Sequence, residues 1–263
     1  MPKVPGPSAS LEAIQDDRRS KAVHPGRSRM KTVVLAGGAG TRLRSLVPDL
    51  PKPMAPIDGR PFLEYLIERL VKGGMTEIVL SVGHRAQAIS DHFGASWGGA
   101  TISYSIEGEP LGTGGAVAYA TSGWNEASFL VVNGDTYVGI DFADLAAWAA
   151  QAPASAIGMV LRRVDDVTRY GAVICAAGLV CGFAEKGDSG PGLINAGVYL
   201  LDPAVFSRFG LAGRFSLESD LFQAHVAALQ PRAYVTDSFF IDIGVPEDYI
   251  RAQTTIPQHA SAA

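Results

Sequence analysis

The stretch VVLAGGAGTRLRSLVPDLPKPMAPIDGRPFLEYLI, residues 33–67, contains a short strand, a glycine-rich loop and an amphipathic helix in close succession. Residues 32–36 are almost entirely apolar, which predicts a short buried strand. Residues 61–72 place apolar side chains at helical spacing, begin with a proline in the first turn and end before two glycines. The order strand, loop, helix predicts the first unit of an α/β fold.

The loop in this stretch carries Gly37, Gly38 and Gly40 directly after the strand. Glycine lets backbone N–H groups approach an anion closely and tolerates positive φ. The loop is not a P-loop, because no Gly-Lys-Ser/Thr follows at the required spacing. It is not a dinucleotide fingerprint either, because Leu43 stands where the third glycine is needed.

Two cations follow the glycines. Arg42 offers a planar guanidinium that matches phosphate oxygens, and Lys52 lies between Pro51 and Pro53, which stiffen the backbone around it. The alternative is a tight turn with two solvated cations. An apolar strand followed by GGAGTRL and PKP in this order favours a phosphate-binding loop over that alternative.

Strands and helices continue to alternate up to about residue 161. Strands are predicted at 77–82, 102–106, 129–133 and 156–161, and helices at 85–93, 113–120 and 142–151. Such alternation predicts a parallel sheet with right-handed crossovers. A ligand cleft is expected at the C-terminal edge of its strands.

After residue 161 the pattern changes. We predict a hairpin over 170–186, a strand at 193–201, a helix over 216–229 with Ser216 as N-cap, a strand at 239–244 and a last helix from Pro246. The predicted fold is α/β, with a Rossmann-like, mostly parallel sheet flanked by helices in the first half (30–161) and a mixed second lobe (162–253). Residues 1–29 are expected to be a disordered extension, with Met30 as an alternative start, and residues 254–263 a flexible tail.

Composition excludes several classes of protein. The 263 residues carry a net charge of −4, with a pI near 5.7, which argues against nucleic-acid binding. No run reaches the roughly 18 apolar residues of a membrane helix, and the first 29 residues lack the apolar region of a secretion signal. Cys175 and Cys181 are too few for a disulfide framework and are expected to be free thiols in the cytoplasm.

Several motifs occur in a familiar order: LAGGAGTRLRSL with LPKP, LGTGGAV (111–117), VVNGDTYV (131–138), GFAEKG (182–187), LINAGVYLL (193–201) and FIDIGVPEDY (240–249). Together they resemble the sugar-1-phosphate nucleotidylyltransferases, over about residues 31–253. Within that family the chain is most similar to D-glycero-D-manno-heptose 1-phosphate guanylyltransferases. It also resembles short mannose-1-phosphate guanylyltransferases and N-acetylmuramate-1-phosphate uridylyltransferases. The resemblance implies the nucleotide-diphospho-sugar transferase fold, with a nucleotide-binding first half and a sugar-binding second half.

The implied reaction is attack by the phosphate of a sugar 1-phosphate on the α-phosphorus of a nucleoside triphosphate, with release of pyrophosphate. The nucleophile is already ionised at neutral pH, so cations and positioning matter more than a general base. The resemblance assigns catalysis to Arg42, Lys52 and Asp135, and one Mg²⁺ to Asp135 with Asp242. Each aspartate taken alone would be read as an ordinary turn residue.

The resemblance also implies the binding residues. For the nucleotide they are Leu35, Ala36, Gly37, Gly38, Gly40, Thr41, Glu109, Gly112, Thr113 and Gly114, with Glu109 facing guanine. For the sugar phosphate they are Gly171, Glu185, Lys186, Asn195 and Glu218. Lys186 is expected to neutralise the phosphate. An amide and carboxylates suit sugar hydroxyls. A surface ion pair, a strand-edge hydrogen bond and a helix-terminal charge are the structural alternatives for Lys186, Asn195 and Glu218.

The resemblance implies GTP and the heptose 1-phosphate, with mannose 1-phosphate and GTP, or another sugar 1-phosphate and UTP, as alternatives. A non-catalytic nucleotide-sugar sensor is an alternative of another class. That alternative predicts losses among Arg42, Lys52, Asp135 and Asp242, all of which are present. The oligomeric state, including a homo-oligomer, stays open.

Overall fold

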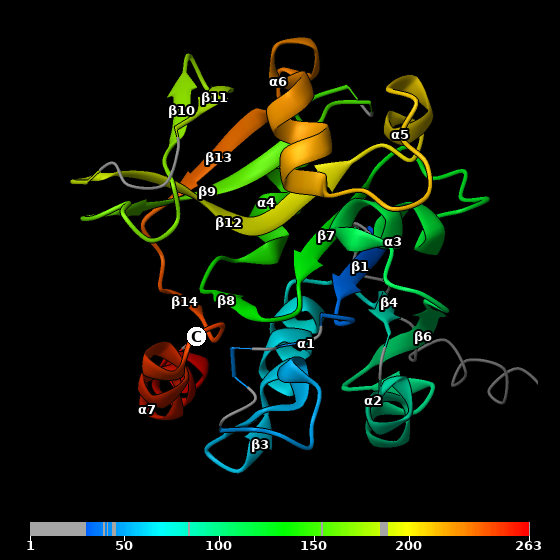
Figure 1. The fold of residues 1–263 in the computed structure, drawn as a ribbon, viewed down its shortest axis with the longest axis vertical. Helices are drawn as coiled ribbons and strands as arrows, with labels where there is room; N and C mark the ends of the chain where they lie inside the picture. Colours follow the sequence, from blue (N-terminus) through cyan, green and yellow to red (C-terminus); the bar gives the residue numbers. More distant parts are fainter. Residues whose placement is uncertain are drawn as a thin grey trace, which may run out of the picture.

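The computed structural model describes residues 30–38, 40, 42–43, 46–83, 85–153, 155–184 and 189–262. Within them, one ten-stranded sheet crosses the molecule (Figure 1). In order of pairing its strands are β10 (Val173–Ala176), β11 (Leu179–Phe183), β13 (Arg232–Thr236), β9 (Gly158–Val164), β12 (Gly192–Leu201), β7 (Phe129–Asn133), β1 (Thr32–Leu35), β4 (Glu77–Val82), β6 (Ala100–Ile106) and β5 (Ser96–Trp97). The predicted extension over 1–29 lies outside the described residues.

The sheet changes character where β12 joins it. Strands β7, β1, β4 and β6 are parallel neighbours, as predicted for the first half of the chain. Strand β12 runs antiparallel to both β7 and β9, whereas β9 and β13 are parallel. The predicted α/β class is therefore confirmed. The alternating pattern predicted that β9 continues the run of parallel strands next to β7. Instead, the antiparallel strand β12 lies between β9 and β7.

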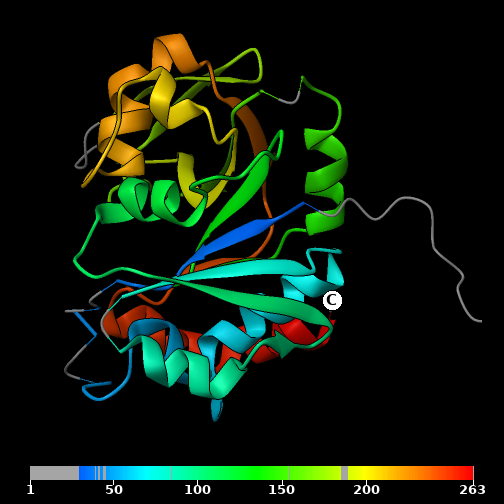
Figure 2. The ribbon, with the colours of Figure 1, turned by 90° about the vertical axis from the view of Figure 1, so that its right-hand side faces the viewer.

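Helices cover both faces of the sheet. On one face lie α1 (Phe62–Lys72), α2 (Ala86–Phe93) and α4 (Phe142–Ala149). On the other lie α3 (Gly112–Ala120), α5 (Val205–Arg208), the π-helical segment η2 (Leu217–Gln223) and α6 (Ala224–Leu229). Figure 2 shows α3 and α4 on opposite sides of β1 and β7. Strand periodicity explains this, because Val34 and Val132 pack with α1 and α4, while Val33 and Val131 pack with α3 and η2.

A third buried cluster lies beneath the last helix. Strand β8 (Thr136–Val138) pairs with β14 (Phe240–Asp242), and β2 (Pro56–Ile57) pairs with β3 (Arg60–Pro61). The cluster joins these ribbons to α7 (Pro246–Ala262). The flexible tail predicted over 254–263 is wrong as far as Ala262, because the helix continues and buries Ile256 completely. Among the described residues, no helix is both long enough and apolar enough to cross a membrane.

Candidate active site

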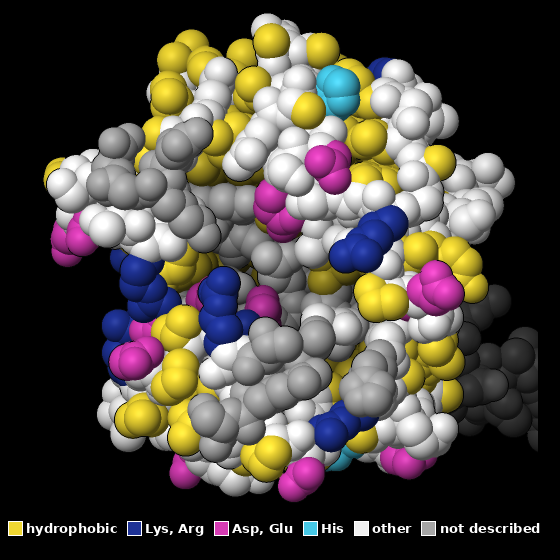
Figure 3. Space-filling view, in the orientation of Figure 1, with side chains coloured by type: hydrophobic (Ala, Val, Ile, Leu, Met, Phe, Trp, Pro, Cys, Tyr) yellow, Lys and Arg dark blue, Asp and Glu magenta, His cyan; other side chains and the backbone are white. Residues whose placement is uncertain are grey.

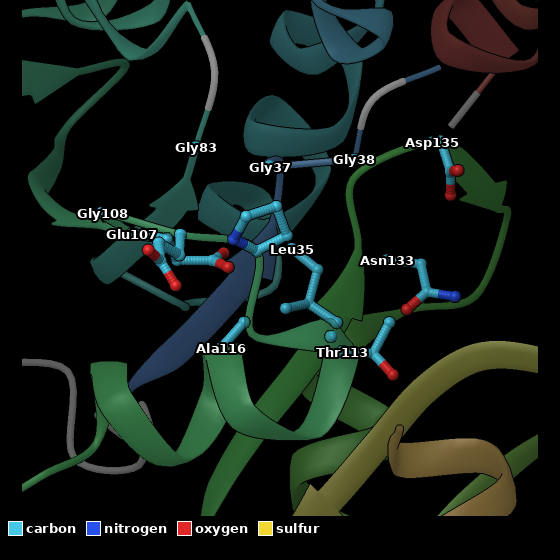
Figure 4. A pocket seen from close by; sticks show the side chains of 13 residues that line it. Leu35, Gly37, Gly38, Gly83, Glu107, Gly108, Thr113, Ala116, Asn133 and Asp135 are labelled. Carbon is cyan, nitrogen blue, oxygen red and sulfur yellow. The ribbon is translucent and has the colours of Figure 1, made fainter. Parts of the chain in front are cut away.

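A cavity of about 600 Å³ opens at the C-terminal ends of β1, β4, β6 and β7, the edge that the topology predicted. Its lining residues are Leu35, Gly37, Gly38, Gly83, Glu107, Gly108, Glu109, Pro110, Gly112, Thr113, Ala116, Asn133 and Asp135. Figure 3 shows the hollow in this face with acidic and basic side chains gathered near it. In Figure 4, Glu107 and Asp135 lie at opposite ends of the cavity, with Leu35 between them.

The first two glycines of the loop have different surroundings, and close packing explains only the first of them. A Cβ on Gly37 would meet Glu107 Oε1 at 3.0 Å and the backbone nitrogen of Gly83 at 3.1 Å. Among the residues that the structure describes, none comes within 4 Å of the same position on Gly38. Three strand ends therefore converge on Gly37, while Gly38 leaves room for a ligand to approach the backbone.

The second half of the loop turns back into the core. Gly40 has φ +55°, and a Cβ there would lie 2.9 Å from the Cβ of Lys52. The side chain of Leu43, at the position where a dinucleotide fingerprint needs glycine, is buried in the third cluster. Arg42 between them is exposed and is not among the residues that line the cavity.

The two predicted metal ligands come together through a strand pairing. Asp135 immediately precedes β8, and Asp242 ends β14, where it pairs in register with Thr136. The backbone N–H of Ile243 donates to the carbonyl of Asp135 at 3.0 Å, and the N–H of Gly244 donates to Asp242 Oδ1 at 2.6 Å. Two carboxylates that lie 107 positions apart in the chain thus come close to one another.

Lys52 lies between these carboxylates. Its Nζ is 2.6 Å from Asp135 Oδ2 and 3.5 Å from Asp242 Oδ1, and only 11% of its side chain is exposed. Burial raises the pKa of Asp242, and the charge of Asp135 raises it further, while Lys52 acts in the opposite direction. The cluster of two carboxylates and one ammonium retains a formal charge of −1 when all three groups are ionised, so it favours a further cation.

The donor set fits a partly hydrated magnesium ion. No group of three or more His, Cys, Asp or Glu side chains arranged to hold a metal occurs in the part of the chain that the structure describes. Two carboxylates are nevertheless what Mg²⁺ commonly takes from a protein, with water and substrate phosphates supplying the remaining ligands. The ammonium of Lys52 already occupies a cation position between them.

The predicted GTGG loop divides into ligand-facing and packing residues. Gly112 and Thr113 line the cavity. Gly114 instead packs on Phe215, because a Cβ there would lie 2.1 Å from the phenyl ring, and its N–H donates to the Phe215 carbonyl at 3.0 Å. Gly114 is therefore explained by helix packing in this structure, and its contact with a nucleotide stays a prediction.

Asn195 and Glu218, both predicted to contact the sugar, belong to one hydrogen-bond network. Asn195 Nδ2 donates to the hydroxyl of Tyr199 at 2.8 Å, and that hydroxyl donates to Glu218 Oε1 at 3.2 Å. Glu218 Oε2 accepts from Thr113 Oγ1 at 2.7 Å and from Ser216 Oγ at 3.0 Å. The structure thus joins two residues predicted for the sugar to one predicted for the nucleotide.

The remaining predicted residues have different outcomes. Leu35 and Glu109 line the cavity, and Ala36 is buried beside it. Gly171 has φ +80° in the loop between β9 and β10 and is not among the residues lining this cavity. Thr41, Glu185 and Lys186 lie outside the described residues. The sequence reasoning missed Glu107 and Asn133, although both directly follow or end predicted strands, a position that could have indicated them.

Over residues 31–259 the chain matches the family model described as nucleotidyl transferase. The chain belongs to this nucleotidyl transferase family, as its motifs predicted.

Among known proteins, the chain is similar to two D-glycero-alpha-D-manno-heptose 1-phosphate guanylyltransferases. The enzyme of Aneurinibacillus thermoaerophilus is 40% identical over 230 residues, covering 88% of this chain and 99% of the relative. The enzyme of Campylobacter jejuni subsp. jejuni serotype O:2 is 42% identical over 221 residues, covering 84% and 97%. The crystal structure of HddC from Yersinia pseudotuberculosis complexed with GMP-PN has a TM-score of 0.74 and 37% identity, covering 86% of this chain and 99% of that one.

Proposed function

We propose that the chain transfers GMP from GTP to D-glycero-α-D-manno-heptose 1-phosphate, giving a GDP-heptose and pyrophosphate. Two near-full-length heptose 1-phosphate guanylyltransferases at 40% and 42% identity support the reaction. The observation in the molecule that carries the proposal is the facing pair Asp135 and Asp242 beside a glycine-lined cavity. This arrangement suits a magnesium–triphosphate complex.

In this proposal the backbone at Gly37 and Gly38 approaches the triphosphate, and Arg42 and Lys52 balance charge that moves onto the departing pyrophosphate. Asp135 and Asp242 would hold Mg²⁺, which would supply positive charge that lowers the repulsion between the two substrates. The sugar phosphate needs no deprotonation, so the chain's part is to align and neutralise. Asn195 and Glu218 bind sugar hydroxyls, and Lys186 and Glu185 contribute from the same half of the chain.

For the base, we propose that a glutamate at this end of the cavity recognises guanine. The two candidates are Glu107 and Glu109. The guanine edge carries two adjacent N–H donors, which a carboxylate can accept together. Glu107 is held in place, since its Oε2 accepts from the backbone N–H of Leu111 at 2.9 Å and its Oε1 accepts weakly from Ser81 Oγ at 3.4 Å. Glu109 is exposed at the cavity mouth. Glu107 is thus the better ordered of the two.

A substrate matrix tests the proposal. Purified protein with Mg²⁺ is assayed for pyrophosphate release with each of four nucleoside triphosphates against the heptose, mannose and N-acetylmuramate 1-phosphates. The highest kcat/KM is expected for GTP with the heptose 1-phosphate. A preference for mannose 1-phosphate or for UTP would move the assignment to those alternatives, and no turnover with any pair would support the sensor.

We also place the reaction in the cytoplasm. Cys175 and Cys181 are both unpaired, which accords with a reducing compartment.

A further inference from the structure

The direction of every hydrogen bond around Tyr199 can be assigned. The backbone N–H of Gly197 can only donate, and it donates to Asn195 Oδ1 at 2.9 Å. The amide of Asn195 must therefore turn its Nδ2 toward Tyr199, at 2.8 Å. The tyrosine oxygen then accepts, so its own proton points to Glu218 Oε1 at 3.2 Å.

Tyr199 is held rigidly in this arrangement. It lies on β12 with only 1% of its surface exposed, and its ring stacks on Phe222 of η2 with centroids 5.1 Å apart. Burial, followed by the nearby charge of Glu218, raises the pKa of Tyr199 well above its ordinary value. The hydroxyl therefore stays protonated at every working pH and cannot act as a base.

The network leaves one hydrogen-bond donor on Asn195 and one acceptor site on Glu218 available to a ligand. Within the described residues, Asn195 keeps one free N–H, because the other points to Tyr199. Glu218 Oε2 already accepts two hydroxyls, whereas Oε1 accepts only the tyrosine and retains one acceptor site. Asn195 and Glu218 are each half-buried, so a ligand can reach them. They present one donor and one acceptor at a spacing that Tyr199 fixes.

We propose that Tyr199 is a positioning residue, which sets the distance and orientation between Asn195 and Glu218 so that they engage two hydroxyls of the sugar 1-phosphate together. The inference rests on the proposed function, because that function makes these two residues sugar contacts. Tyr199 itself touches no substrate. Without its hydroxyl, Asn195 loses an acceptor and Glu218 loses a donor, and each gains rotational freedom.

The test compares Tyr199→Phe with a matched control, Tyr65→Phe. Tyr65 is also buried, and its hydroxyl donates to a backbone carbonyl, that of Ile57, at 3.3 Å, away from this network. Steady-state kinetics with the sugar 1-phosphate that wild type uses best should show a KM for that sugar about tenfold higher in Tyr199→Phe, the effect of about one lost hydrogen bond. GTP binding, measured by calorimetry without sugar, should stay within twofold. Tyr65→Phe should change neither quantity.

A second arm asks whether Tyr199 acts through its two partners. In an Asn195→Ala/Glu218→Ala background, adding Tyr199→Phe should produce no further rise in the KM for the sugar, because nothing remains to be positioned. A full additional tenfold rise would overturn the inference. So would an unchanged sugar KM in the single variant, an equal loss of GTP affinity, or failure of Tyr199→Phe to fold where Tyr65→Phe folds. Absence of turnover in wild type, by contrast, would refute the proposed function before any variant is compared.

Discussion

The ammonium of Lys52 lies 2.6 Å from a carboxylate oxygen of Asp135, although 83 positions separate the two residues in the chain. The same ammonium reaches Asp242 at 3.5 Å. It therefore balances, at least in part, two carboxylates that would otherwise repel one another. A metal ion entering between them must displace it.

Lys52→Met should consequently bind Mn²⁺ alone, without nucleotide, at least about tenfold more tightly than wild type does. Two charges about 4 Å apart near a protein surface interact by about 4 kcal/mol, so removing the competing ammonium favours the incoming ion. Arg42→Met is the matched control, since it removes the same charge from the neighbouring loop without touching either carboxylate in the structure described. Electron paramagnetic resonance of free Mn²⁺ measures both affinities. Equal affinities in the two variants would show that Lys52 does not compete for this position.

Asp242→Asn should lower kcat by at least about 100-fold, as expected when a fixed charge at the reacting phosphates is removed. Asp237→Asn, on the exposed loop before β14, is its control and should retain turnover. A near wild-type kcat in Asp242→Asn at ordinary Mg²⁺ would refute the metal assignment.

Asp242→Asn should also change the thermal stability of the metal-free protein, measured in the presence of a chelator. The pKa of Asp242 is raised in the folded protein, so the folded state binds protons more tightly than the unfolded state at this position. Its contribution to stability is therefore lost as pH rises through the folded pKa. Asp242→Asn should melt at a higher temperature than wild type at neutral pH, and the difference should disappear below the ordinary pKa of 3.8. Melting curves at several pH values would check this, and a lower melting temperature at neutral pH would contradict it.

Glu107→Gln should weaken discrimination for guanine more than Glu109→Gln does. The amide offers a single acceptor atom, so one of the two N–H donors of guanine loses its partner. With inosine triphosphate, which lacks the 2-amino group, wild type should lose about 1–3 kcal/mol of transition-state binding, whereas Glu107→Gln should lose much less. The kcat/KM ratio of GTP to ITP measures the effect. If only Glu109→Gln reduced that ratio, the exposed glutamate would be the one that reads the base.

Ile256→Ala should destabilise the protein by about 2–5 kcal/mol, because Ile256 of α7 is fully buried in the third cluster. Ile250→Ala, on the same helix with 64% of the residue exposed, should change stability by less than about 0.5 kcal/mol. Denaturant unfolding of both variants makes the comparison. A small effect at Ile256 would mean that the end of α7 does not pack as described.

The sequence predicted the largely apolar strands of the first half and missed β13, which is only partly buried. β1, β4 and β7 are mostly apolar, and all three were expected. β13 was missed, because none of its five residues is fully buried and its pattern resembles a loop. The helical end after residue 253 was missed because its burial depends on residues far away in the chain.

In the candidate site too, the sequence predicts the residues that have a local pattern and misses contacts between distant parts of the chain. Glycines next to strands, and carboxylates at strand ends, could be found from local pattern. The position of Lys52 between two aspartates could not, because it depends on the pairing of β8 with β14. The packing role of Gly114 required Phe215, about a hundred positions later, to be placed against α3.

Strand β14 supplies Asp242 long after Lys52 and Asp135 in the sequence, and α7, which follows it, covers the ribbon that holds it. On a ribosome, the glycine loop, Lys52 and Asp135 would all emerge long before their last partner. In the proposed function, a nascent chain therefore carries a phosphate site that lacks one of its two carboxylates until β14 has emerged. Order of synthesis would thus tie the proposed binding of metal and nucleotide to the pairing of β14 with β8.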